Sequence, residues 1–137
     1  MNSIHIKSSA ASAIGLIAIS EFPKECCGFF WGDKNAIRLA KEVKNNSFEN
    51  KSESFRISDA DYLSAEEFAE KNNVLLLGVF HSHPNQPALP SREDLDFAMP
   101  NFVNIIVSVG REGVREMRAW VLKEDEQQLT EIKIKIN

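Results

Sequence analysis

The stretch GVFHSHPNQPALPSREDLDFA (residues 78–98) joins an apolar run to two histidines, a proline-rich segment and an acidic helix start. In a β-strand, residues i and i+2 point to the same face. His81 and His83 would therefore project side by side from the end of the apolar run at residues 74–80. Ser82 would point to the opposite face. Because two imidazoles at this spacing can reach one ion at about 2.0–2.1 Å, the pair predicts part of a metal site.

Asp94 offers a third ligand from the first turn of a helix expected at residues 91–98. Between it and the histidines stand Pro84, Pro87 and Pro90, which restrict the conformations of the connecting loop. Two histidines and one carboxylate leave a fourth position for water, as in a catalytic zinc site. The same ligand set also suits non-haem iron, so the residues alone do not name the metal.

Asp94 also has a purely structural interpretation. Ser91 is a typical helix N-cap, and Asp94 follows three residues later, where its carboxylate can bond back to the cap as in a capping box. In that case no metal is bound, and the histidines are hydrogen-bonded polar residues at a strand end. Both interpretations require the same carboxylate, and the pattern leaves both open.

A metal-activated water also needs a base that accepts its proton. The pattern does not choose among Glu21, Glu25, Glu42, Glu49 and Glu53. Glu25 attracts interest because it precedes an apolar strand, where its carboxylate would be partly buried. The alternative for Glu25 is a solvated strand end.

The composition limits the classes of partner. Apolar residues make up 43% and charged residues 26% of the 137 residues, which is typical of one soluble globular domain covering residues 1–137. The net charge is −4 without a basic run, so we expect no nucleic-acid partner. The longest apolar runs, ASAIGLIAI and VLLLGVF, are too short to span a bilayer. The first also lacks a basic start and a cleavage site, so we expect no signal peptide and no membrane segment.

The only cysteines, Cys26 and Cys27, are adjacent. Adjacent cysteines form no disulfide framework and suit a reducing compartment, so we expect a cytoplasmic protein. A thiol enzyme that pairs one of them with a histidine is an alternative mechanism. Both cysteines lie in an apolar run, where thiols usually only pack.

Periodicity predicts an α/β protein of the α+β kind, with helices packed on a mixed, largely antiparallel sheet. The expected helices cover residues 8–20 with Ser8 as N-cap, residues 59–71 with Ser58 as N-cap, and residues 91–98. The expected strands cover residues 25–33, 36–43, 55–57, 74–80, 102–110, 114–123 and 129–136, with tight turns at 33–35 and 110–113. The second helix would bury Tyr62, Leu63, Ala65, Phe68 and Ala69, and the second strand would place Ile37, Leu39 and Val43 on one face.

The motifs together resemble a known family. From His81 to Asp94 the sequence reads H-S-H-x7-S-x2-D, which resembles the JAMM signature of the JAB/MPN metallopeptidases at every defined position. The segment PKECCGFFWG (residues 23–32) resembles the family's P-x-E-x-C-G segment, and NNSFENKSESFRIS (residues 45–58) is similar to its N-x-S-x(n)-F-x-I stretch. The resemblance extends over about residues 4–122 and is to the compact, bacterial-type, single-domain members.

This resemblance implies a curved sheet flanked by helices, and a zinc hydrolase. His81, His83 and Asp94 would hold Zn²⁺ with a water as fourth ligand. Glu25 would be the catalytic base, and Ser91 would donate a hydrogen bond to the oxyanion.

Members of the family cut amide or isopeptide bonds after the C-terminal Gly-Gly of ubiquitin-like proteins. The turn in SVGREGVRE (residues 108–116) leaves no room for the zinc-bearing insertion of eukaryotic deubiquitinases. The resemblance therefore implies the tail of a ubiquitin-like or sulfur-carrier protein, or a small conjugate, as substrate. The alternative is a catalytically silent MPN-type scaffold, which would lack the ligands.

Overall fold

A computed structural model describes residues 1–34 and 36–137. The elements in chain order are β1 (Ser3–Ile6), α1 (Ser8–Glu21), β2 (Cys27–Asp33), β3 (Ala36–Val43), α2 (Asp59–Lys71), β4 (Leu75–Pro84), α3 (Arg92–Phe97), β5 (Val103–Gly110), β6 (Gly113–Leu122) and β7 (Leu129–Ile136). None of the helices in the described residues is long and apolar enough to cross a membrane.

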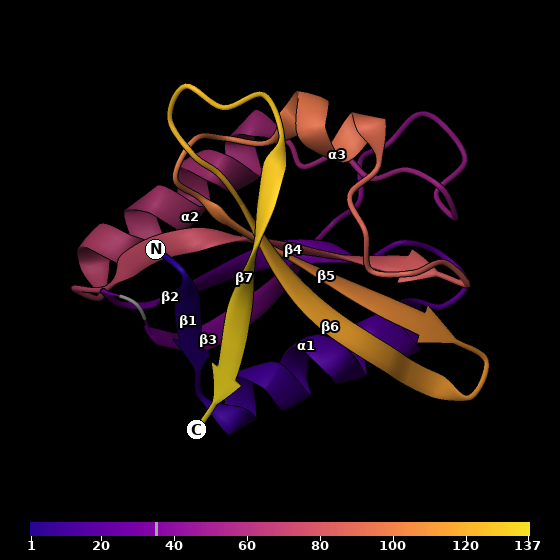
Figure 1. Cartoon of the computed structure of the whole chain (residues 1–137), viewed down its shortest axis with the longest axis horizontal. Helices are drawn as coiled ribbons and strands as arrows, with labels where there is room; N and C mark the ends of the chain where they lie inside the picture. The colour runs from indigo at the N-terminus through magenta and orange to yellow at the C-terminus, as the bar shows by residue number, and fades with distance from the viewer. Residues whose placement is uncertain (35) are drawn as a thin grey trace.

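The strands form one mixed sheet that closes into a barrel in the order β1-β3-β2-β4-β5-β6-β7 (Figure 1). β1 pairs in parallel with both β3 and β7, so the first strand seals the barrel. β4 and β5 are also parallel, and the remaining neighbours are antiparallel. The mixed α/β fold confirms the prediction in outline. The sheet closes on itself, however, and the expected layers of flanking helices are not confirmed.

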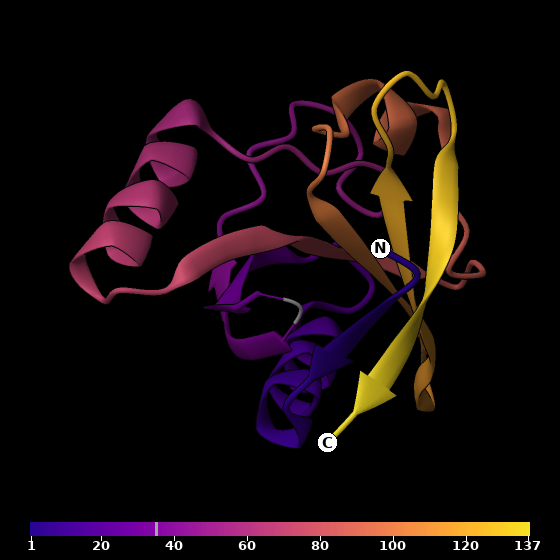
Figure 2. The same ribbon diagram turned by 60° about the vertical axis from the view of Figure 1, so that its left-hand side comes forward.

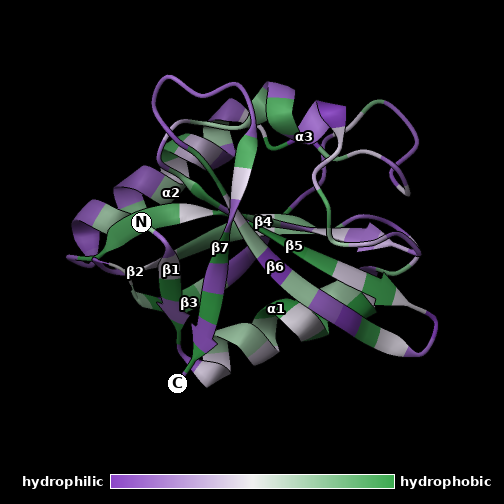
Figure 3. Ribbon diagram, in the orientation of Figure 1, coloured by the Kyte–Doolittle hydropathy of each residue, from purple (hydrophilic) through white to green (hydrophobic). Residues whose placement is uncertain are grey.

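The larger hydrophobic cluster lies between α1 and the inner face of the sheet. Helix α1 contributes Ala10, Ile14 and Ala18, and the central strands contribute Phe30 and Phe80. β5 is hydrophobic along most of its length, whereas β6 and β7 alternate between hydrophilic and hydrophobic residues (Figure 3). This alternation is the pattern of strands with one face in the core and one in water.

A second cluster lies on the other face of the sheet, under α2, which stands on a different side of the barrel from α1 (Figure 2). Phe29 and Trp31 of β2 pack there against Tyr62 and Phe68 of α2. The predicted inward face of α2 is wrong at Leu63, whose side chain is 58% exposed. The predicted N-cap Ser58 is confirmed, because its side chain accepts a hydrogen bond from the Asp61 N–H.

Three local predictions are wrong. Ser8 is the first residue of α1 and not its cap, since the N-cap is Lys7 without a side-chain bond. Residues 55–57 form no strand. Leu39 is exposed, because the pairing of β2 with β3 shifts register beside it and turns the side chain outward. The predicted turn at residues 33–35 includes Asn35, which lies outside the described residues.

Candidate metal centre

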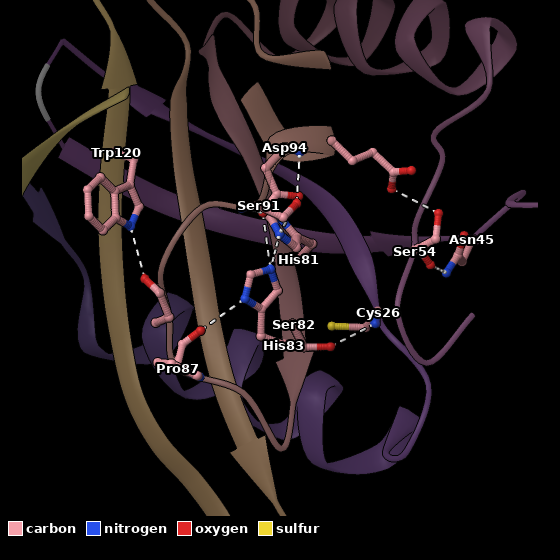
Figure 4. A network of polar contacts seen from close by, with 12 residues as sticks. Cys26, Asn45, Ser54, His81, Ser82, His83, Pro87, Ser91, Asp94 and Trp120 are labelled. Atoms are coloured by element: carbon pink, nitrogen blue, oxygen red, sulfur yellow. Dashed lines mark hydrogen bonds and ion pairs between the residues drawn. The ribbon is translucent and has the colours of Figure 1, made fainter. Parts of the chain in front are cut away.

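His81 and His83 lie at the end of β4 on the outer face of the barrel, as the strand period predicts. Their side chains are almost completely buried, and their Nε2 atoms are 3.1 Å apart (Figure 4). Ser82 points to the opposite face, where its Oγ accepts a hydrogen bond of 2.8 Å from the Cys26 N–H. The bond fixes the end of β4 against the segment that leads into β2.

Asp94 closes the group from α3. Its Oδ1 lies 3.2 Å from His81 Nε2, and its Oδ2 lies 3.1 Å from His83 Nε2. The same Oδ2 accepts a hydrogen bond of 2.8 Å from the Ser91 N–H, and the Asp94 N–H donates to Ser91 Oγ at 3.1 Å. The capping box and the contact with both imidazoles therefore exist together, and the two interpretations of Asp94 do not exclude each other.

The donor set fits a cation. His83 Nδ1 lies 3.0 Å from the Pro87 carbonyl oxygen, which can only accept, so Nδ1 carries the proton and a neutral ring presents a lone pair at Nε2. Nε2 faces Asp94 Oδ2 and His81 Nε2. In a protonated ring it donates to the carboxylate, and in a neutral ring it offers its lone pair to a cation at the same point. The buried Nδ1 of His81 has no hydrogen-bond partner among the described residues. Lone pairs and a carboxylate turned toward one point are the arrangement of a metal site whose outer partners fix the imidazole.

Glu25, two residues before the start of β2, completes the group. It is 5% exposed, and Glu25, His81 and His83 offer ligand atoms that lie within 4.8 Å of one another, a grouping that could hold a metal ion. The ladder explains this position: Cys27 pairs with His81, so Glu25, two residues earlier, falls on the same face beside His83. Burial raises the pKa of Glu25 to about 8, although His83 acts in the opposite direction.

Burial and hydrogen bonding shift the pKa values of His81, His83 and Asp94 in opposite directions. Burial lowers the pKa of His81. Burial would also lower the pKa of His83, but the hydrogen bonds with Asp94 and Pro87 outweigh it and raise that pKa. For Asp94, burial is outweighed by the hydrogen bonds with both histidines, which hold its pKa well below the usual range. The site therefore keeps Asp94 ionised.

The proline-rich loop is held by side chains that the sequence analysis did not single out. Ser108 donates a hydrogen bond to the Gln86 carbonyl oxygen. Trp120 Nε1 donates to the Ala88 carbonyl oxygen at 3.1 Å, and the Ala88 N–H donates to a carboxylate oxygen of Glu116 at 3.0 Å. These residues lie on β5 and β6, and only the strand pairing brings them to the loop.

Neither cysteine is arranged as a nucleophile. Cys26 packs in the larger hydrophobic cluster, and burial raises the pKa of its thiol to about 12. Burial also raises the pKa of Cys27, which packs in the second cluster. A thiolate is therefore disfavoured at both positions, which argues against the thiol mechanism.

A cavity of about 500 Å³ opens beside the site between α2 and α3. His81 and Asp94 line it, but Glu25 and His83 do not. Apolar side chains form most of the remaining wall: Phe55, Ile57, Tyr62, Leu63, Val79, Phe97, Met99, Ile106 and Leu129. Its size and lining are those of a binding pocket for a small molecule or a peptide segment.

Comparison with known proteins agrees with this geometry. The chain is 33% identical over 119 residues to a desampylase from Pyrococcus furiosus, a match that covers 87% of this chain and 81% of that protein. It is 30% identical over 89 residues to the tail tip assembly protein K of Escherichia phage N15, of which it spans 34% of the length.

Solved structures match nearly the whole chain. A protein from Desulfitobacterium hafniense superposes with a TM-score of 0.80 at 25% identity, covering 98% of this chain and 92% of that one. A protein from Salinibacter ruber has a TM-score of 0.76 at 26% identity over the same shares. A JAB1/MPN domain protein from Archaeoglobus fulgidus has the same fold, with a TM-score of 0.65 at 17% identity over 97% and 98% of the two chains. The model of the prokaryotic homologs of the JAB domain matches residues 7–123, so the chain belongs to this JAB family.

Proposed function

We propose that this protein is a zinc-dependent hydrolase that cuts a peptide or isopeptide bond after the C-terminal Gly-Gly of a ubiquitin-like or sulfur-carrier protein. The observation that carries the proposal is the convergence of two buried imidazoles and one carboxylate beside a buried glutamate. The desampylase relative supports hydrolysis of the isopeptidase type.

In this proposal His81, His83 and Asp94 hold Zn²⁺. Bound zinc would polarise a water and lower its pKa to roughly 7. Asp94 supplies the negative charge of the ligand set, since its pKa lies well below the usual range. The Pro87 carbonyl oxygen fixes the tautomer of His83.

Glu25 moves the proton. It accepts a proton from the water whose oxygen attacks the amide carbonyl carbon. The C–N bond then breaks, and Glu25 returns the proton to the leaving nitrogen, so that a carboxylic acid and an amine are formed. Burial raises the pKa of Glu25 to about 8 in the metal-free protein, and a cation bound beside it would lower that pKa and favour the carboxylate that accepts the proton.

In this proposal Ser91 stabilises the oxyanion. Its Oγ already accepts the Asp94 N–H, so its hydroxyl proton remains available to donate to a second acceptor. One such donor contributes roughly 2.7–4 kcal/mol to the stabilisation of a tetrahedral intermediate in comparable sites.

The apolar cavity supports a peptide tail as substrate. It touches His81 and Asp94 but not Glu25, which delivers the proton to the leaving group, so we place the acyl side of the substrate there. An extended chain covers about 3.3–3.6 Å per residue. Two glycines would therefore span roughly 7 Å from the scissile bond, and the side chains that precede them would reach the cavity. We further propose that the protein acts in the cytoplasm, which its two free, buried cysteines suit.

The test compares wild type with Glu25→Gln on a Gly-Gly-tailed carrier joined to a second protein or peptide. We expect about one zinc per chain in both proteins by mass spectrometry, and cleavage by the wild type only. A variant that still turns over substrate would remove Glu25 from this role. Zinc-free protein after reconstitution, with carrier bound but uncut, would instead favour the silent scaffold.

A further inference from the structure

We propose that Asn45, Ser54 and Glu93 are positioning residues that hold Glu25 and the helix of Asp94 at a fixed separation. The inference rests on the proposed function, because it assigns a role in that reaction to residues that do not touch the substrate. Asn45 and Ser54 belong to residues 44–57, here called the bridging segment, and Glu93 contacts this segment through Ser54. This segment has no regular secondary structure and crosses from β3 to α2 over the site.

Both backbone polar groups of Glu25 bond to the bridging segment, which is their one partner within the described residues. Its N–H donates to the Lys51 carbonyl oxygen at 2.6 Å, and its carbonyl oxygen accepts from Asn45 Nδ2 at 3.1 Å. Glu25 precedes β2 and has no ladder pairing of its own among the described residues, although Cys26 beside it bonds to Ser82 through its N–H and its carbonyl oxygen. The register between β2 and β4 sets the face on which Glu25 lies, and the bridging segment holds the backbone that carries its side chain.

Asn45, which lies beside Ser54 in Figure 4, uses its whole amide in this arrangement. Nδ2 also donates to the Ser54 carbonyl oxygen at 3.0 Å, and Oδ1 accepts from the N–H groups of Ser47 and Arg56 at 3.0 and 3.1 Å. Two donated and two accepted bonds satisfy an asparagine side chain almost completely. One side chain thus ties both ends of the bridging segment to Glu25.

Ser54 continues the network to the other side of the site. Ser54 is 7% exposed, and its Oγ donates a hydrogen bond of 2.9 Å to Glu93 Oε1. Glu93 is the neighbour of Asp94 on α3, a helix of six residues that needs outside support. The ring of Phe55 stacks on His81 with a centroid distance of 4.3 Å and an angle of 19°. The bridging segment therefore contacts Glu25, His81 and α3 at once.

The network has two separable effects. The bond from Asn45 sets where the Glu25 carboxylate stands, so its loss should slow proton transfer without changing the affinity for substrate or metal. The bond from Ser54 to Glu93 holds the start of α3, so its loss should weaken the hold of Asp94 on the metal. If these residues only stabilised the fold, their substitution would lower the melting temperature but would not affect kcat at one position and zinc affinity at the other.

The first experiment compares Asn45→Ala with Asn50→Ala. Asn50 is the matched control, because its side chain also bonds within the bridging segment, to Ser52, but not to Glu25. For Asn45→Ala we expect kcat to fall about 10- to 100-fold, with KM and zinc content within twofold of wild type. For Asn50→Ala we expect kcat within twofold of wild type. An Asn45→Ala protein that is folded and has wild-type kcat, or an equal loss in both variants, would overturn the inference.

The second experiment needs no turnover and therefore separates this inference from the proposed function. Glu93→Ala and Glu93→Gln both remove the charge, but only glutamine keeps an oxygen that can accept from Ser54 Oγ. In competition with a zinc chelator, Glu93→Ala should bind zinc about 10-fold more weakly than wild type, or weaker still. Glu93→Gln should bind zinc with nearly wild-type affinity. The visible spectrum of the cobalt-loaded proteins should differ from wild type in the alanine variant only. Equal affinities in the two variants would refute the role of the bond, even if the wild type cuts no Gly-Gly substrate.

Discussion

Asp94 Oδ2 lies 3.1 Å from His83 Nε2, although the two residues belong to different elements separated by an irregular loop. The same oxygen accepts the N–H of Ser91 and so caps α3. One carboxylate oxygen therefore serves both the start of a helix and the centre of the site. A change at Asp94 should affect the stability of α3 and the binding of metal together.

Replacing Asp94 by asparagine removes the negative charge but keeps an oxygen at the cap. We expect zinc affinity to fall at least about 10-fold, because even outer partners of metal ligands contribute 10- to 100-fold. The melting temperature of the metal-free protein should also fall, because the folded state favours the ionised carboxylate that asparagine lacks. Chelator competition and calorimetry measure the two quantities, and an unchanged zinc affinity would exclude Asp94 as a ligand.

Removal of metal should leave the protein folded. The buried cluster between α1 and the sheet contains large side chains such as Phe30, Phe80 and Ile105, none of which is a candidate metal ligand. This core differs from that of a zinc finger, whose folding energy comes from the metal. The far-ultraviolet circular dichroism spectrum should be the same before and after chelation. Its collapse would contradict the prediction.

The stability of the metal-free protein should decrease as the pH rises from about 4.5 to about 8. Burial raises the pKa of Glu25 from 4.5 to about 8, so over this range the folded state keeps a proton that the unfolded state releases. The contribution is complete below the lower value and lost above the upper one. It amounts to a few kcal/mol, on the order expected for a shift of this size.

Glu25→Gln isolates this effect, because glutamine does not titrate and the nearby His83 and Asp94 are the same in both proteins. Urea unfolding of the chelated proteins at pH 5 and pH 8.5 should show a smaller loss of unfolding free energy in the variant than in the wild type. Identical pH dependence in the two proteins would mean that Glu25 is not protonated in the folded state.

A charge at the cavity rim should weaken substrate binding. Leu63 lines the cavity and is 58% exposed, so Leu63→Glu should fold. We expect kcat/KM for a carrier with an apolar residue before its Gly-Gly to fall about 10-fold, mainly through KM, since part of a leucine contact is lost. Leu16→Glu is the control, because Leu16 is 66% exposed on α1 and lies outside the cavity lining. Equal effects of the two substitutions would place the tail elsewhere.

Activity should be insensitive to thiol alkylation. Burial raises the pKa of both Cys26 and Cys27, so little thiolate forms at neutral pH. Treatment of the folded enzyme with iodoacetamide should leave hydrolysis unchanged, whereas a zinc chelator should abolish it. The reverse result would support the thiol mechanism.

The sequence predicted the features that depend on neighbours along the chain. The strand period of two placed His81 and His83 side by side, and short polar residues before the helices marked Ser58 and Ser91 as N-caps. It failed where two strands meet: the register shift that exposes Leu39 depends on the pairing of β2 with β3. The closure of the barrel by β1 also has no local signal, because it depends on two distant partners.

The site divides in the same way. The spacing from His81 to Asp94 is local and indicated a metal site from the residues alone, while the choice of Glu25 rested on family resemblance. Only the tertiary structure brings Glu25 beside His83, because the register between β2 and β4 decides it. The bridging segment, likewise, acts through hydrogen bonds between residues far apart in the chain. Local periodicity determined which side chains point together, and strand register determined which of them meet.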